Sequence, residues 1–228
     1  MRGCDVKRSS RSLRVQSGAS TIVTRSPSKT TLHAAEQDRP DVGAARAELK
    51  AEQPKLKAAR LVFIDGTAVT TKMVRQYGRA PVGERLVAKV PHGHWKTLTL
   101  IAALRIDGVT APFVIDGAMD GAAFLACVIA VLAPTLSTGD IVCMDNVRMH
   151  KVAGVAEALA AAGAKRRYLP AYSPDLNPIE NAGSKIKSGL RKASARTVDA
   201  LTNVVGRTIR TIATSECAGY FRNAGYRA

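Results

Sequence analysis

The sequence predicts an α/β fold in which a mixed five-stranded sheet is flanked by helices, and three observations support this prediction. A continuous apolar run at residues 61–64 is typical of a buried central strand. Two β-type segments, 96–105 and 109–115, are joined by Asp107-Gly108, which is a strong hairpin signal. Strands and helices then alternate along the rest of the chain.

The alternating part begins with a helix expected over roughly residues 121–132, followed by a strand at 141–144. A second helix is expected over 152–162, closed by Gly163, and a last strand over 167–169. Three leading strands followed by this alternation are the order of elements in the RNase H-like fold, which carries acids at strand ends and on an adjoining helix.

The chain divides into three parts by composition. Residues 1–30 hold seven Lys or Arg, one acid and seven serines without any period, so we expect a disordered basic segment. An acid-poor, Arg- and Ser-rich start also resembles an organellar transit peptide, but no amphipathic helix is evident. We expect residues 31–58 to be a connector with a short helix before Pro54, and residues 59–228 to be the folded domain.

Charge indicates the class of partner. The net charge of +16 and the pI near 10.2 favour nucleic acid, although charge alone leaves ribosomal or acidic-lipid binding open. No apolar run approaches the roughly 18 residues of a membrane helix, so we expect no membrane association. The four cysteines form no C-x-x-C pair, which favours small buried side chains over a disulfide or zinc framework.

Two aspartates follow apolar runs that we expect to be strands. Asp65 ends the run at 61–64, and Asp145 follows the run at 141–144. If these strands are neighbours, their ends lie only ~5 Å apart, within reach of one hard divalent cation. Each aspartate alone is also an ordinary residue for a turn after a strand.

A third acid follows a Pro-rich loop. Asn177 is expected to cap a helix with Pro178 at its first position, which places Glu180 one turn into the helix. A capping box between Asn177 and Glu180, worth about 1 kcal/mol, explains Glu180 without any catalytic role. Both roles are compatible.

The ordered set of motifs resembles the insertion sequence 630 family, the bacterial relatives of mariner-type transposases with a DDE catalytic domain. The resemblance covers roughly residues 32–226, and 34 residues separate Asp145 from Glu180, as in the glutamate-bearing branch of that superfamily. The motifs that carry it are Phe63-Ile64-Asp65, Tyr77-Gly78-Arg79-Ala80-Pro81 with Gly83-Glu84-Arg85, Pro91-His92-Gly93-His94-Trp95-Lys96, Met144-Asp145-Asn146 with His150-Lys151, and the segment Tyr172 to Glu180.

The resemblance implies a DNA transposase catalytic domain with Asp65, Asp145 and Glu180 as catalytic residues and metal ligands. Three carboxylates at one site repel unless cations hold them, so two Mg²⁺ or Mn²⁺ ions are the expected cofactors. The implied nucleophiles are water in cleavage and a 3′-hydroxyl in strand transfer. The implied partners are transposon ends and target DNA, bound by a homodimer in the bacterial cytoplasm at the nucleoid.

Basic residues near these motifs are the expected DNA contacts. For the histidines and the helix after Glu180, packing or a solvated basic face remains the alternative. The expected DNA-binding residues are Arg79, Arg85, His92, His94, Lys96, His150, Lys185, Lys187, Arg191 and Lys192.

Three departures from the family stand out. Gly66 replaces a common glutamate, although strand alternation would turn that side chain away from Asp65. Ala171 replaces a proline. Residues 1–30 show no recognition-helix pattern, so our hypothesis is a truncated or frameshifted copy without the helix-turn-helix module.

Two other interpretations remain. A basic DNA-binding remnant without catalysis would keep the acids by ancestry alone. The Asp65-Gly66-Thr67 segment also resembles haloacid-dehalogenase-type phosphatases, but Phe63 stands where their nucleophilic aspartate belongs.

Overall fold

The computed structural model describes residues 34–75, 77–90 and 93–228, and residues 34–228 form one compact unit. Its five strands are β1 (Leu61–Thr70), β2 (Thr97–Arg105), β3 (Gly108–Asp116), β4 (Ile141–Met144) and β5 (Lys165–Tyr168). They form one mixed sheet in the order β3-β2-β1-β4-β5. The β1–β2 and β2–β3 pairs are antiparallel, and the β1–β4 and β4–β5 pairs are parallel. The predicted fold class is confirmed.

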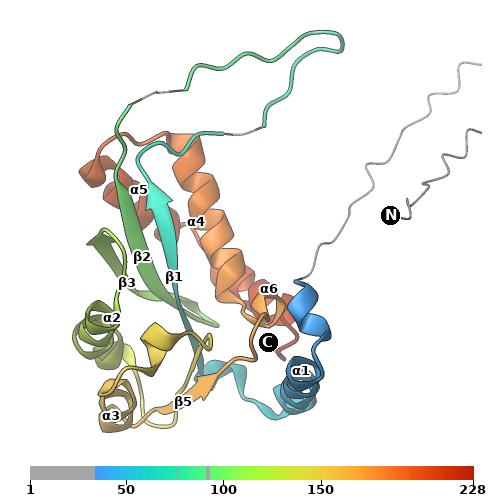
Figure 1. Ribbon diagram of the computed structural model, residues 1–228, viewed down its shortest axis with the longest axis vertical. Helices are drawn as coiled ribbons and strands as arrows, with labels where there is room; N and C mark the ends of the chain where they lie inside the picture. The colour runs from blue at the N-terminus through green and yellow to red at the C-terminus, as the bar shows by residue number, and fades with distance from the viewer. Residues whose placement is uncertain (1–33, 76, 91–92) are drawn as a thin grey trace, which may run out of the picture. The chain divides into compact units, whose positions relative to one another are not determined.

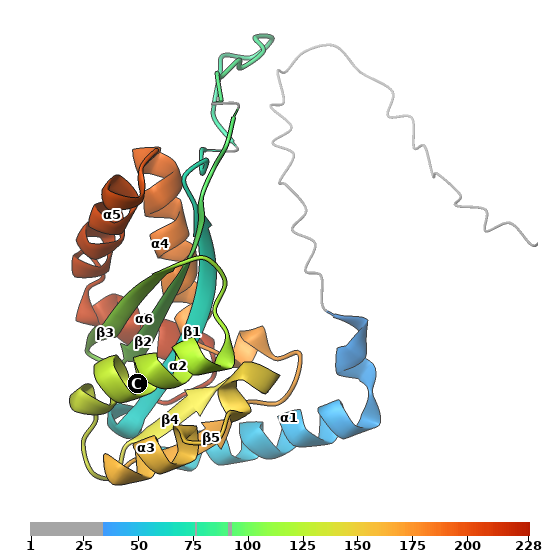
Figure 2. The same ribbon diagram turned by 60° about the vertical axis from the view of Figure 1, so that its left-hand side comes forward.

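Helices cover both faces of the sheet (Figures 1 and 2). Alternate residues of β1 point to opposite faces, so Leu61 and Phe63 join one apolar cluster while Val62 and Ile64 join the other. The first cluster is completed by α1 (Pro40–Glu52), α4 (Ile179–Ala193), α5 (Val198–Arg210) and α6 (Thr214–Asn223). The second is completed by α2 (Gly121–Cys127), the π-helical turn Val128–Leu132 and α3 (Val155–Ala161). The sheet is therefore the middle layer of three.

The strand that carries Asp65 is longer than predicted. Only residues 61–63 pair with β4, whereas β1 continues beside β2 as far as Thr70. Asp65 thus lies inside β1, at the point where one of its two neighbours ends. The apolar run that predicted the strand ends before Asp65, so its continuation was missed. Beyond Phe63, β1 pairs with β2 alone, and a strand there need not carry apolar side chains on both faces.

Other boundaries also shift. The hairpin loop is Ile106-Asp107, and Gly108 already belongs to β3. The predicted helix 121–132 ends as an α-helix at Cys127 and continues as the π-helical turn. The predicted helix 152–162 is α-helical only over Val155–Ala161, after a left-handed residue at Gly154. Strand β5 begins two residues early because, at the edge of the sheet, exposed Lys and Arg side chains are tolerated.

The described part of the expected connector packs against the sheet. Helix α1 begins at Pro40, and its Leu49 is buried in the first apolar cluster. Between β1 and β2, residues 71–75, 77–90 and 93–96 belong to an arm at the top of Figure 1 and contain neither helix nor strand. No helix among the described residues is both long enough and apolar enough to cross a membrane.

Candidate active site

The register of the parallel strands places Asp65 beside Asp145. Leu61, Val62 and Phe63 pair with Ile141, Val142 and Cys143 in turn, so the same register carried two residues further sets Asp65 opposite Asp145. Neighbouring strands lie about 5 Å apart. Two aspartates 80 positions apart in the chain are therefore neighbours because β4 lies next to β1 in the sheet.

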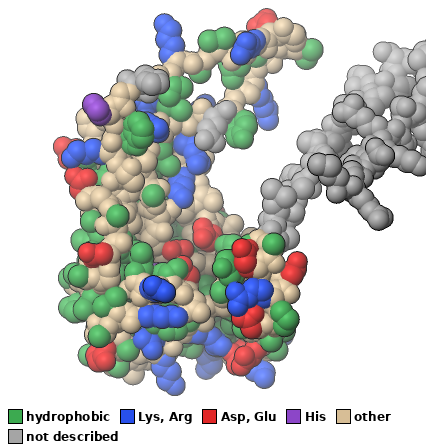
Figure 3. Space-filling view, in the orientation of Figure 1, with side chains coloured by type: hydrophobic (Ala, Val, Ile, Leu, Met, Phe, Trp, Pro, Cys, Tyr) green, Lys and Arg blue, Asp and Glu red, His purple; other side chains and the backbone are tan. Residues whose placement is uncertain are grey.

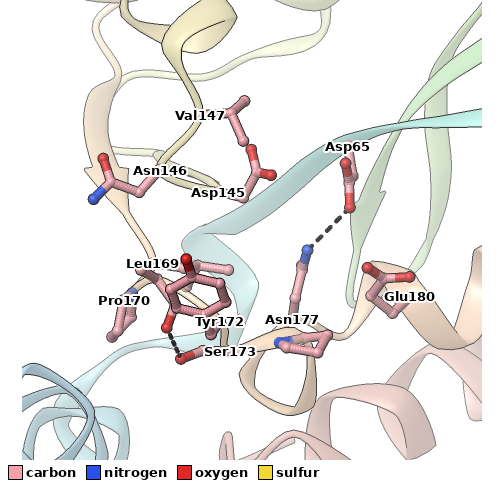
Figure 4. A pocket seen from close by; sticks show the side chains of 12 residues that line it. Asp65, Asp145, Asn146, Val147, Leu169, Pro170, Tyr172, Ser173, Asn177 and Glu180 are labelled. Atoms are coloured by element: carbon pink, nitrogen blue, oxygen red, sulfur yellow. Dashed lines mark hydrogen bonds between the residues drawn. The ribbon is translucent and has the colours of Figure 1, made fainter. Parts of the chain in front are cut away.

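Glu180 approaches the same place from a helix. It is the second residue of α4, whose buried residues Ile179, Ala182 and Ile186 pack in the first apolar cluster. Asp65, Asp145 and Glu180 line a cavity of about 390 Å³, together with the loop of residues 169–174. Figure 4 shows the three carboxylates around this cavity.

The charges of the three acids influence one another. The pKa of Asp65 is raised to about 6, first by burial and then by the negative charges of Asp145 and Glu180. A hydrogen bond from the Gly66 backbone N–H and the nearby His150 oppose this rise. Such mutual repulsion is expected when carboxylates are gathered without a cation between them.

Asp65 accepts two hydrogen bonds, whereas the Asp145 carboxylate lies close to an imidazole nitrogen. The amide Nδ2 of Asn177 donates to Oδ2 of Asp65 at 3.3 Å (Figure 4), and the Gly66 N–H donates to Oδ1 at 2.7 Å. Nδ1 of His150 lies 2.5 Å from Oδ1 of Asp145. By contrast, Glu180 is exposed, and no described residue forms a hydrogen bond or ion pair with its carboxylate.

The predicted capping box is wrong. Helix α4 begins at Ile179 with Pro178 as its N-cap, and no side chain caps it. Asn177 is 4% exposed and directs its amide to Asp65 instead. Since Asn177 is buried next to a carboxylate, satisfying that carboxylate is favoured over capping a helix whose first N–H groups can use backbone carbonyls.

Helix α1 braces the loop before Glu180. Arg46 donates to Asp175 through both Nη atoms, at 2.9 and 2.7 Å, and to Oγ of Ser173 at 2.7 Å. Gln37 donates to the carbonyl of Tyr172, a non-glycine residue with φ of +53°. Sequence reasoning missed Arg46 and Gln37, because no local pattern signals a contact across more than 120 residues.

A family model matches the part of the chain that contains these acids. The model described as DDE superfamily endonuclease matches residues 60–202, which includes all three acids. This chain belongs to the DDE superfamily endonucleases. No curated protein matches the chain.

Solved structures of the Mos1 mariner transposase share the fold of this DDE endonuclease. The paired-end complex with Mn matches with a TM-score of 0.67 and 14% identity, covering 89% of this chain and 64% of that one. The pre-cleavage transpososome matches with a TM-score of 0.60 and 14% identity, and the match covers 81% of this chain and 58% of that one. The isolated catalytic domain matches with a TM-score of 0.60 and 13% identity, and the match covers 86% of this chain and 91% of that one. This chain therefore spans about three fifths of the protein in those two complexes and most of the catalytic domain.

The family match and the core together exclude the phosphatase interpretation. Phe63 is fully buried, and its ring centroid lies 5.3 Å from that of Phe221 and 5.1 Å from that of Tyr226. The position two residues before Asp65 is therefore part of the core of this DDE endonuclease.

The donor set of the DDE site fits a hard divalent ion. Three carboxylates supply the oxygen ligands that Mg²⁺ and Mn²⁺ prefer, and their mutual repulsion on Asp65 is what a cation would relieve. As they stand, no three His, Cys, Asp or Glu side chains within the described ranges are close enough together to hold an ion. The carboxylates line one cavity without meeting at one point.

Gly66 contributes its backbone N–H to this site, but a side chain at this position would not face it. A Cβ built at Gly66 would lie 2.9 Å from Cε of Met119 and near Thr99 and Ile101, on the opposite face of the sheet from Phe63. The common glutamate of relatives would thus point away from Asp65, as strand alternation predicts. Nothing in the structure explains Ala171.

The expected DNA contacts fall into three groups. Arg79, Arg85 and His94 are exposed on the arm, where Figure 3 shows Lys and Arg side chains, and exposed Lys96 pairs with Asp116. His92 lies outside the described residues, as do residues 1–30. On α4, the ammonium of Lys185 lies 2.5 Å from Glu216, and Arg191 and Lys192 lie in the last turn.

Lys187 and His150 differ from the rest. Lys187 lines a second cavity, of about 330 Å³, that also includes Asp65, Asp145 and Glu180. His150 is 1% exposed, so its ring has no surface that a DNA phosphate could contact. Its contact is with Asp145.

Proposed function

We propose that this DDE endonuclease is the catalytic part of a cut-and-paste DNA transposase of the insertion sequence 630 type. The observation that carries the proposal is that Asp65, Asp145 and Glu180, far apart in sequence, line one cavity. The shared fold with a mariner transposase supports it. The proposed reactions are phosphodiester hydrolysis at transposon ends and strand transfer.

Each acid has a distinct part in the proposed chemistry. Two divalent ions bound at the site would activate the attacking oxygen and neutralise charge on the leaving 3′ oxygen. Asp65 and Asp145 would hold them from the sheet and Glu180 from α4. Because the pKa of Asp65 is near 6, its carboxyl group loses its remaining proton on binding a cation, so affinity for the ion should rise with pH through that range.

The groove between the sheet and α4 is the proposed path of the DNA strand. The second cavity is lined by Thr67 and Leu100 on the sheet side and by Ser184 and Lys187 on α4. Lys187 lies seven residues after Glu180, about 10 Å along the helix axis at 1.5 Å per residue. This separation suits a phosphate one or two nucleotides from the scissile bond.

Lys185 provides a matched control for this path, because Glu216 and the Thr211 carbonyl already engage its ammonium. Lys187→Gln should weaken DNA binding and reduce the slope of log affinity against log salt concentration by about one phosphate contact, whereas Lys185→Gln should not.

We further propose that the protein acts as a homodimer on DNA in the bacterial cytoplasm at the nucleoid, since two transposon ends require two active sites.

The deciding experiment is metal-dependent cleavage. The protein is incubated with supercoiled plasmid and with duplexes of the element's own ends, in Mg²⁺, Mn²⁺ or chelator, beside its Asp145→Asn variant. The proposal expects nicking that needs the metal and the carboxylate. DNA binding with no metal-dependent cleavage by the unmodified protein would favour a DNA-binding remnant.

A further inference from the structure

His150 is the one histidine in the described residues that is buried, and it lies against a proposed metal ligand. Its Nδ1 is 2.5 Å from the side-chain Oδ1 of Asp145 and 3.3 Å from the Asp145 carbonyl oxygen. The ring is 1% exposed, whereas the Asp145 side chain is 41% exposed. Oδ1 of Asp145 is buried and has no hydrogen-bond partner among the described residues, so the close Nδ1 of His150 is the group placed to donate to it. The Asp145 residue also lines the cavity.

The imidazole is held in place from several sides. The ring packs against Phe124 with a centroid separation of 4.2 Å and an interplanar angle of 36°. The His150 N–H donates to the Val147 carbonyl at 3.2 Å within the 3-10 turn Arg148–Lys151. The hydroxyl of Tyr168, at the end of β5, donates to the His150 carbonyl at 3.1 Å. The ring position is thus fixed by α2, β5 and the turn itself.

The surroundings of the ring assign its tautomer. Nδ1 faces two oxygen acceptors, so the proton belongs there. Nε2 is buried and has no hydrogen-bond partner among the described residues. A proton on Nε2 would bury a donor without an acceptor and would turn a lone pair on Nδ1 toward two oxygens, which is unfavourable on both counts.

We propose that His150 is a positioning residue, whose Nδ1–H fixes Oδ1 of Asp145 so that Oδ2 is presented to the divalent ion. The inference rests on the proposed function, because it takes Asp145 as a metal ligand. Outer residues that orient a ligand in this way commonly affect metal affinity 10–100-fold. No other described side chain holds the Asp145 carboxylate.

Two amide substitutions test the role of one atom. The side-chain nitrogen of asparagine is as many bonds from Cα as Nδ1 of histidine, and that of glutamine is as many as Nε2. His150→Asn should therefore keep a donor beside Asp145, whereas His150→Gln should displace it. Both place an amide in the same pocket, so a merely structural role of the histidine would affect both alike.

The measurements are Mn²⁺ affinity by calorimetry without DNA, the metal dependence of cleavage, and melting temperature. We expect His150→Gln to weaken Mn²⁺ binding by roughly 10–100-fold and His150→Asn by only a few-fold, at similar melting temperatures. Equal Mn²⁺ affinities for the two variants, or unchanged affinity in His150→Gln, would overturn the proposal.

A second measurement separates this inference from the proposed function. In the metal-free protein, ¹⁵N–¹H correlation through the imidazole should show the proton on Nδ1, and Asp145→Asn should shift that signal. A proton on Nε2 would overturn the positioning role. Binding of Mn²⁺ that depends on His150, without any DNA cleavage, would instead overturn the proposed function and leave the positioning role intact.

Discussion

The two halves of the candidate site are built differently. Asp65 lies in β1 and accepts hydrogen bonds from Gly66 and Asn177, and Asp145 directly follows β4 with its carboxylate close to Nδ1 of His150. Glu180 lies in the first turn of α4, is exposed, and is not bonded to any described side chain. The sheet therefore fixes two of the proposed ligands, while the position of the third depends on where α4 and its loop lie. Closure of the site on an ion is expected to come from the Glu180 side.

The largest effect on cleavage is expected from the two aspartates of the sheet. Asp145→Asn removes the charge of a proposed metal ligand next to the sheet, and an amide is a poor ligand for Mg²⁺. Cleavage should fall by roughly 10³-fold or more, which exceeds the 10–100-fold typical of outer residues. The measurement is the rate of metal-dependent duplex cleavage.

Asp116→Asn is the matched control for this loss. Asp116 ends β3 on the same sheet, is exposed and pairs with Lys96. Its loss should leave cleavage near the unmodified rate. Equal losses in both variants would show that general charge, and not the site, governs the reaction.

Substitution of Glu180, on α4, should change activity without changing stability. Glu180→Gln removes the charge from an exposed side chain that makes no capping bond, so the melting temperature should stay constant. Cleavage should fall by about 10²-fold or more, with a higher Mn²⁺ concentration at half-maximal rate. Retained cleavage would remove Glu180 from the site and leave the two aspartates as the only ligands.

The stability of the metal-free protein should depend on pH through Asp65. Asp65 has its pKa raised from 3.8 to about 6, so between these values the folded state binds more protons than the unfolded state. The stability that this group contributes therefore falls as pH rises from about 4 to about 6. Asp65→Asn should raise the free energy of unfolding at pH 7 by roughly 1–3 kcal/mol, and the gain should vanish near pH 4.

Urea unfolding of both proteins with chelator at several pH values checks this prediction. The orphan Oδ1 of Asn177 can accept from the new amide if the Asn177 side chain flips, so the substitution need not bury an unpaired donor. A constant stability difference across pH 4–7 would contradict the assigned repulsion. Added Mn²⁺ should stabilise only the unmodified protein.

The smallest effect is expected at Arg46, whose side chain binds the loop before Glu180. Arg46→Met removes the two-pronged bond to Asp175 and the bond to Ser173, which should cost about 1–2 kcal/mol and lower cleavage several-fold. The control is Arg39→Met, since Arg39 pairs with Asp41 at an exposed position two residues away in sequence. Thermal unfolding and cleavage rates of both variants test whether α1 supports the Glu180 loop.

Local pattern was enough to predict much of this protein. The run Ile141 to Met144 is strand β4 with the predicted bounds, because four consecutive apolar residues between turn signals have few other structures. The order of strands and helices also followed from period and turn residues. The three acids were singled out by their ordered motifs and the resemblance these carry, and their role stays a prediction. These features are determined by neighbours in the sequence, which act before any long-range contact forms.

Only the tertiary structure decided what surrounds those acids. Asp65 lies inside a strand because β2 continues where β4 ends, and Asn177 binds Asp65 instead of capping α4. His150 is buried beside Asp145 because Phe124 packs on its ring and the Tyr168 hydroxyl donates to its backbone carbonyl, both from other elements. The sequence determines which side chains can ligate an ion or donate a hydrogen bond. Which of them meet depends on packing between segments far apart in the chain, where burial makes each unpaired polar group costly and so selects its partner.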